Sequence, residues 1–96
     1  MSDARGTVAG NRQDHEVVFY GLTTCVWCER TRAFLEESDV GFDYVYVDML
    51  EGDDRARAIE EIKRANPRMN FPTVVIDGTT TVVGYNPDQL KEALGL

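Results

Sequence analysis

The fold is decided by residues 17–28, which read VVFYGLTTCVWC. Residues 16–22 form a nearly continuous apolar run, which is typical of a strand at the centre of a sheet covered on both faces. Apolar residues at helical spacing follow directly in residues 28–35. Cys25 and Cys28 therefore fall where a strand ends and a helix begins.

The two cysteines are a candidate redox pair. A helix N-terminus has unsatisfied backbone N–H groups and about half a positive charge, and both stabilise a thiolate over a thiol. Cys25, the earlier cysteine, is therefore expected to be the nucleophile. Cys28 follows in the first helical turn on the same face, where it can attack a mixed disulfide and release the reduced substrate. The spacing provides one attacking and one resolving thiol.

Other uses of two cysteines fit the sequence less well. A zinc site needs about four ligands, whereas the chain has two cysteines and one histidine, His15. A disulfide that closes so short a loop constrains the unfolded chain little. Two buried cysteines that only fill the core are a further alternative, but Cys25 precedes the helix in a loop, where burial is disfavoured. We therefore expect no metal and no cofactor.

The composition indicates one small globular domain. The 96 residues suffice for a single core, and no apolar run approaches the roughly 18 residues that cross a membrane. The polar N-terminus has no signal-peptide core, so we expect a cytoplasmic protein without membrane contact. A net charge of −7 opposes nucleic acid binding and favours partners with neutral or basic surfaces. We expect a monomer, because nothing in the sequence indicates an obligate dimer.

The chain is predicted to form a β-α-β-α-β-β-α domain over residues 15–96. Residues 1–14 combine small polar residues and balanced charges without an apolar period, which is typical of a flexible tail. Alternating aromatic and β-branched residues predict a second strand over residues 42–47. It should run parallel to the first strand, because a helix connects the two. A second helix is expected to begin with Asp53 as its N-cap and to end at Asn66.

Two further strands and a helix are expected near the C-terminus. Residues 72–76 and 79–83 are β-branched runs, and the Asp77-Gly78 turn between them is a strong hairpin signal. Asn86 precedes a proline and stands three residues before a glutamine, which predicts the N-cap of a short helix. The fold class is therefore α/β, with a mixed four-stranded sheet flanked by helices.

These motifs together resemble the glutaredoxin family of the thioredoxin superfamily. The strand-Thr-Thr-Cys-x-x-Cys-helix pattern is followed by FPT at residues 71–73 and by GYNPD at residues 84–88. The resemblance covers about residues 16–95 and implies the thioredoxin/glutaredoxin fold. It also implies that Pro72 is cis and lies beside the cysteine pair, and that the backbone of Phe71 pairs with an incoming substrate strand.

Departures from the family pattern indicate a subtype. Members that use glutathione usually carry a lysine or arginine three residues before the first cysteine, where this chain has Leu22. The GYNPD stretch is more similar to the Gly-Phe-x-Pro-Asp of NrdH-type redoxins, which have a glutaredoxin fold and take electrons from a thioredoxin reductase. The resemblance therefore implies an electron donor of the thioredoxin reductase type. Glutathione stays open as a donor, because Arg68 offers a carboxylate a partner.

The expected function is the reduction of disulfides, in proteins or small molecules, as part of electron transport and cell redox homeostasis. The alternatives are a glutathione-dependent glutaredoxin, an iron–sulfur cluster carrier and a non-catalytic binding module of the same fold. Trp27 either lies on the exposed rim of the site, as a contact for a partner, or folds back onto the helix. The residues expected to bind substrate are Val26, Trp27, Phe71, Pro72, Gly84, Tyr85 and Asp88.

Overall fold

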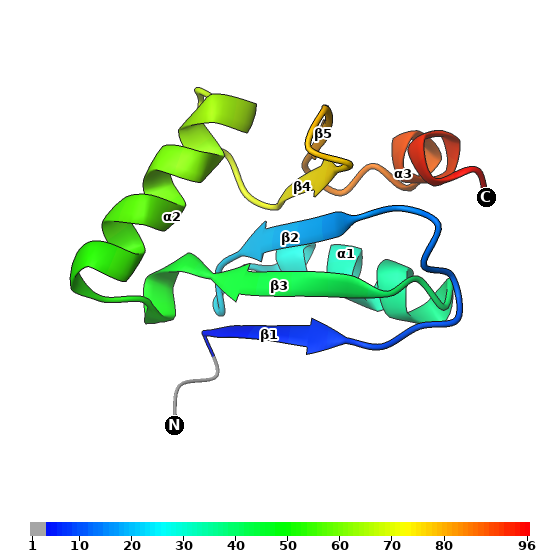
Figure 1. The fold of residues 1–96 in the computed structure, drawn as a ribbon, viewed down its shortest axis with the longest axis horizontal. Helices are drawn as coiled ribbons and strands as arrows, with labels where there is room; N and C mark the ends of the chain where they lie inside the picture. The colour runs from blue at the N-terminus through cyan, green and yellow to red at the C-terminus, as the bar shows by residue number, and fades with distance from the viewer. Residues whose placement is uncertain (1–3) are drawn as a thin grey trace.

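A five-stranded sheet forms the centre of the protein in a computed structural model that describes residues 4–96 (Figure 1). The strand order is β1-β3-β2-β4-β5. The strands are β1 (Arg5–Val8), β2 (Val17–Gly21), β3 (Phe42–Tyr46), β4 (Thr73–Ile76) and β5 (Thr80–Val83). The helices are α1 (Val26–Glu37), the short 3-10 helix η1 (Val47–Met49), α2 (Gly52–Ala65) and α3 (Pro87–Leu94). None of these helices is long and apolar enough to cross a membrane.

Helices cover both faces of the sheet, as the apolar first strand predicted. Phe19 of β2 lies in one core cluster with Leu35 of α1 and Leu90 of α3. The next residue, Tyr20, lies in a second cluster with Ile62 of α2, because successive side chains of a strand point to opposite faces. In Figure 1, α1 lies behind β2 and β3, and α2 stands at the left end of the sheet. Each fully buried Phe, Leu or Ile side chain contributes about 1.5 to 3 kcal/mol.

The strand directions confirm the predicted order of elements. β2 and β3 are parallel neighbours, with Val18 opposite Asp43, and α1 connects them. β4 is antiparallel to β2 and β5 is antiparallel to β4, so the sheet is mixed. The predicted hairpin is present, and the turn residues Asp77 and Gly78 have φ values of 55° and 69°.

The N-terminal segment differs from the prediction. Arg5–Val8, which was expected in a flexible tail, forms strand β1 and pairs antiparallel with β3. Ala4 is buried, and its carbonyl accepts the Tyr46 N–H at 2.7 Å. The sheet therefore has five strands instead of the predicted four. Residues 1–3 of the predicted tail lie outside the described residues.

The residues of β1 are exposed or half-buried, which explains why the strand carries no apolar signature. Gly6 pairs with Tyr44, and a Cβ at Gly6 would meet the Tyr44 ring. A larger residue at this position would require the ring to shift. The segment after β1 is also held, because Asn11 donates its backbone N–H and its side-chain amide to the Asp39 carboxylate at 3.2 and 2.6 Å.

The helix caps agree with the sequence at α3 and differ at α2. Asn86 accepts the Gln89 N–H at 3.2 Å as the N-cap of α3, which was predicted. Such a cap is worth about 1 kcal/mol. At α2 the N-cap position is held by Glu51, without a side-chain hydrogen bond. The predicted cap, Asp53, lies within the first turn, where its charge interacts with the positive end of the helix dipole.

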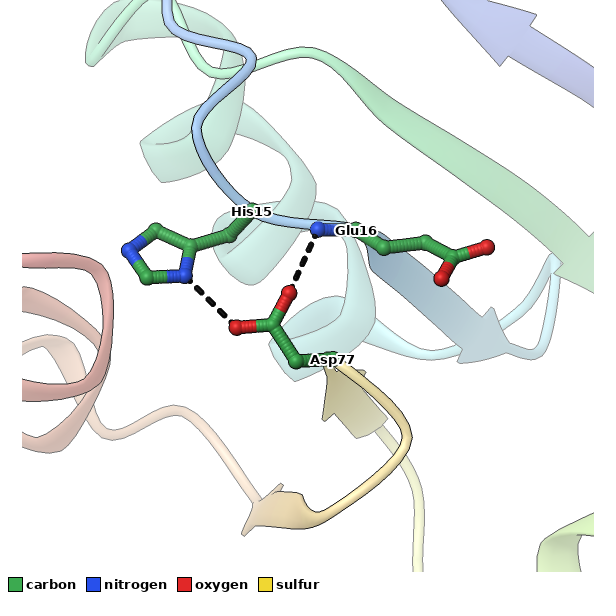
Figure 2. A network of polar contacts seen from close by, with 3 residues as sticks. All are labelled: His15, Glu16 and Asp77. Atoms are coloured by element: carbon green, nitrogen blue, oxygen red, sulfur yellow. Dashed lines mark hydrogen bonds and ion pairs between the residues drawn. The ribbon is translucent and has the colours of Figure 1, made fainter.

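A polar contact fastens the segment before β2 to the β4–β5 turn (Figure 2). One carboxylate oxygen of Asp77 accepts the Glu16 N–H at 2.8 Å, and the other lies 2.7 Å from His15 Nδ1. The Asp77 N–H in turn donates to the Glu16 carbonyl at 2.7 Å. The hydrogen bonds to His15 and to the Glu16 N–H lower the pKa of the Asp77 carboxyl below its ordinary value.

Asp77→Asn is expected to lower the melting temperature at neutral pH, because the folded chain favours the ionised carboxylate. A carboxyl whose folded-state pKa is lowered stabilises the fold above its unfolded pKa and loses that contribution as the pH falls through the folded-state value. The difference from wild type should therefore shrink below about pH 4, in melting curves recorded across that range. Glu60→Gln, which removes an exposed carboxylate in α2, is the control. An equal difference at every pH would contradict this prediction.

Candidate active site

Cys25 is the N-cap residue of α1 and has an extended backbone, with φ −102° and ψ 114°. Its sulfur accepts the Cys28 N–H at 3.2 Å, one of the donors that the first helical turn cannot pair internally. The side chain is half-buried, so the sulfur borders solvent and protein at once. The positive end of the helix dipole favours negative charge at this position.

Cys28 occupies a different environment in the first turn of α1, where it is 1% exposed. Burial, and after it the neighbouring Cys25, raises the pKa of the Cys28 thiol to about 12, although a backbone hydrogen bond from Leu22 acts in the opposite direction. Gly21 allows α1 to approach β2 this closely. A Cβ at Gly21 would lie 3.3 Å from the Cys28 Cβ and 2.8 Å from the Phe19 ring. At neutral pH the second cysteine is therefore a buried, protonated thiol.

The loop that leads into Cys25 is held by a carboxylate that the sequence did not reveal. Thr23 donates its backbone N–H to the two Asp48 oxygens at 3.1 and 3.2 Å, and its hydroxyl also donates to Asp48. Asp48 lies in η1, directly after β3. No local motif links the two residues, because they meet only when β2 and β3 pair.

Trp27 and Tyr85 form an aromatic surface next to the cysteines. Their rings are stacked, with centroids 6.0 Å apart and an interplanar angle of 22°. Trp27 is 53% exposed, so it takes the exposed of the two predicted orientations, and Tyr85 is 39% exposed. The Arg30 guanidinium lies 4.9 Å from the centroid of the Trp27 ring, a cation–π contact that sequence reasoning missed. Val26, on the same helix turn, is also exposed.

The Phe71–Pro72 peptide bond is cis, as the family resemblance implied. Phe71 is half-buried and packs against both core clusters, one of which contains Cys28. The Gly84 N–H donates to the Pro72 carbonyl at 2.9 Å. The two predicted binding segments, residues 71–73 and 84–88, therefore meet.

A buried asparagine shapes the loop before Phe71. The Asn66 side chain donates to the Asn70 carbonyl at 3.3 Å and to the Thr73 hydroxyl at 3.2 Å. Its oxygen accepts the Arg68 N–H at 3.3 Å, and the Thr73 hydroxyl donates to the Asn70 carbonyl at 2.7 Å. The sequence identified Asn66 only as a helix terminator, because its partners lie in an irregular loop that carries no periodic signal.

Some residues singled out in the sequence are not joined to the cysteines. Asp88 is exposed in the first turn of α3, and within residues 4–96 no hydrogen bond or ion pair links it to Cys25 or Cys28. Leu22 packs against the core cluster on the α2 side, and Arg68 is exposed in the loop after α2. In the described part of the chain, no three His, Cys, Asp or Glu side chains are grouped to hold a metal ion.

A mixed sheet with helices on both faces, a Cys-x-x-Cys pair at the start of α1 and a cis-proline before β4 define a thioredoxin-fold protein with a paired-cysteine site. The family model for glutaredoxin matches residues 17–80. The chain belongs to the glutaredoxin family.

Solved structures agree with this assignment. The glutaredoxin from Methanosarcina mazei Go1 is 42% identical, with a TM-score of 0.91 over 98% of this chain and 90% of that chain. Methanoredoxin from Methanosarcina acetivorans is 39% identical, with a TM-score of 0.90 over 95% of this chain and 96% of that chain. The glutaredoxin-like NrdH-redoxin from Escherichia coli is 25% identical, with a TM-score of 0.62 over 80% of this chain and 92% of that chain.

Alkylation should distinguish the two thiols. Cys28→Ser leaves Cys25 as the single thiol, whereas Cys25→Ser leaves Cys28 and keeps an oxygen at the N-cap position. At neutral pH we expect Cys28 to react at least about tenfold more slowly than Cys25, because it is buried and its pKa is raised. Mass spectrometry of timed samples measures both rates, and the same reaction in denaturant, where the rates should converge, is the control. Equal rates in the folded proteins would contradict the assignment.

Proposed function

We propose that this protein is a thiol–disulfide oxidoreductase that reduces disulfides in protein substrates. The observation that carries the proposal is the difference between the two cysteines. Cys25 is accessible and accepts an N–H bond at a helix N-terminus, whereas Cys28 is buried within the same helical turn. An attacking thiol needs access and stabilised charge, and a resolving thiol needs only to reach its neighbour.

The reaction proceeds in two balanced steps. The Cys25 thiolate attacks one sulfur of the substrate disulfide, which forms a mixed disulfide and releases the other substrate sulfur as a thiolate. Cys28 then gives its proton to water or to the thiolate released in the first step and attacks the Cys25 sulfur, which breaks the mixed disulfide and releases the second substrate thiolate. The substrate gains two electrons, and the protein leaves with a Cys25–Cys28 disulfide.

The proposed electron donor is a reductase of the thioredoxin reductase type. Leu22 supports this choice, because an apolar side chain in contact with the core offers no charge to a glutathione carboxylate. The similarity to Escherichia coli NrdH-redoxin is a second support, since that glutaredoxin-like protein has a thioredoxin-like activity profile. We propose that the protein acts as a monomer in the cytoplasm, where cysteine pairs are kept reduced.

Exposed apolar side chains next to Cys25 favour a protein substrate over a small one. Val26, Trp27 and Tyr85 are 59%, 53% and 39% exposed. Large aromatic side chains at a surface supply contact area and commonly dominate binding between proteins. The proposal therefore assigns substrate contacts to this surface, to the backbone of Phe71 and Pro72, to Gly84 and to Asp88, which is exposed in the first turn of α3.

Parallel assays with two electron donors test the proposal. The oxidised protein is incubated with NADPH and thioredoxin reductase, or with glutathione and glutathione reductase, and turnover of a protein disulfide is followed. We expect turnover with thioredoxin reductase, none for Cys25→Ser, and a trapped mixed disulfide for Cys28→Ser. Turnover with glutathione alone would overturn the choice of donor. Turnover by Cys25→Ser at the wild-type rate would overturn Cys25 as the attacking thiol. Absence of turnover by the wild-type protein with both donors would overturn the oxidoreductase assignment and favour a binding module.

Trp27→Ala and Tyr85→Ala are expected to weaken the use of protein disulfides more than the use of small ones. Loss of an aromatic contact at a protein interface typically costs about 1 to 2 kcal/mol, so KM for a protein substrate should rise about fivefold to thirtyfold. Steady-state kinetics with a protein disulfide and with a small dialkyl disulfide measure the two effects. Leu96→Ala, which removes an exposed apolar side chain at the C-terminus, is the matched control. An equal loss with both substrates would point instead to a damaged active site.

A further inference from the structure

The contact between Thr23 and Asp48 joins the active-site loop to the neighbouring strand. Thr23 lies in the exposed connection between β2 and α1. Its N–H and its hydroxyl both donate to the Asp48 carboxylate. Asp48 lies in η1, the short 3-10 helix that follows β3 directly. Because β2 and β3 are parallel, their carboxyl ends lie at the same edge of the sheet and bring the two residues together.

The loop held by Asp48 also carries the groups that contact both cysteines. The Leu22 carbonyl accepts the Cys25 N–H at 3.3 Å. A backbone hydrogen bond from Leu22 also reaches the Cys28 thiol. Thr23 follows Leu22 directly, so the Asp48 contact fixes the backbone next to the residue whose carbonyl accepts the Cys25 N–H.

The charge at Asp48 is stable in the folded protein. Partial burial raises the pKa of its carboxyl, but the hydrogen bonds from Thr23 and the charge of Arg55 outweigh burial and leave the pKa below its ordinary value. The charged groups that act on Cys28 are Cys25 and Asp48. A negative charge on either one disfavours ionisation of the Cys28 thiol.

We propose that Asp48 is a positioning residue of this active site, which holds the Cys25 loop through Thr23. The loop contact keeps the Cys25 sulfur at the start of α1. The Asp48 charge also adds, after burial and the neighbouring Cys25, to the effects that raise the pKa of the Cys28 thiol. This inference rests on the proposed function for its role in turnover, whereas the contacts themselves do not depend on it.

Four variants separate the loop contact from the charge. Asp48→Asn keeps an oxygen acceptor for Thr23 and removes the charge, whereas Asp48→Ala removes both. Thr23→Val removes the hydroxyl bond and leaves the charge, and Thr23→Ser restores the hydroxyl. Asp53→Asn removes an exposed carboxylate from the first turn of α2 and is the control for net charge.

We expect Asp48→Ala to lower kcat/KM for disulfide reduction about tenfold, through misplacement of the nucleophile. Thr23→Val should show a smaller loss, which Thr23→Ser recovers. In a Cys25→Ser background, Asp48→Asn should speed alkylation of Cys28 about twofold to threefold at a fixed alkaline pH, because the opposing charge is gone. Thr23→Val and Asp53→Asn should leave that rate unchanged.

The alkylation rate needs no substrate or reductase, so it separates failure of this inference from failure of the proposed function. If Asp48→Asn leaves Cys28 alkylation unchanged while Asp48→Ala leaves kcat/KM unchanged, Asp48 has no role at this site. If Asp48→Ala does not fold, Thr23→Val tests the loop contact instead. Wild-type kinetics for Thr23→Val would then overturn the proposed role of this contact. Absence of turnover in the wild-type protein, together with faster Cys28 alkylation in Asp48→Asn, would overturn the proposed function alone.

Discussion

At the start of α1 the Cys28 N–H donates to the Cys25 sulfur at 3.2 Å, so the candidate reactive group is also the N-cap of the helix. N-cap positions are usually filled by an oxygen of Ser, Thr, Asp or Asn, because oxygen accepts N–H bonds well. A neutral sulfur is a weak acceptor, and a charged one pairs better with the N–H groups of the first turn. The geometry that ends one strand and begins one helix therefore also places a backbone N–H donor at the sulfur of the proposed nucleophile.

Core packing determines how the second thiol differs from the first. Cys28, Thr31 and Leu35 are the buried residues of α1, and they lie on the side of the helix that packs against the sheet. Cys28 is thus a core residue as well as the proposed resolving thiol, and the burial that packs α1 on the sheet also raises the pKa of its thiol. Gly21 is the residue of β2 that makes room for this turn.

The sequence predicted the elements whose signals are local. The strand-to-helix junction at the cysteines, the Asp77-Gly78 hairpin and the Asn86 cap each depend on residues close together in the chain, and each is present. Contacts over long separations were missed. Thr23 and Asp48 are 25 positions apart and meet only through strand pairing. Strand β1 escaped prediction because its four residues are exposed or half-buried, which leaves no apolar period.

Strand β1 also changes what the sheet presents to other molecules. Without β1, the edge of the sheet would be β3, whose sequence FDYVY is rich in aromatic and β-branched residues. Such an edge is a template for pairing with another chain. β1 occupies those hydrogen-bonding groups and leaves a four-residue edge with sequence RGTV, in which a charged residue is followed by glycine. Short edges that carry charge resist the addition of a further strand. The N-terminal segment therefore covers a sheet edge that would otherwise be open to pairing, in a chain that already exposes Val26, Trp27 and Tyr85 beside its cysteines.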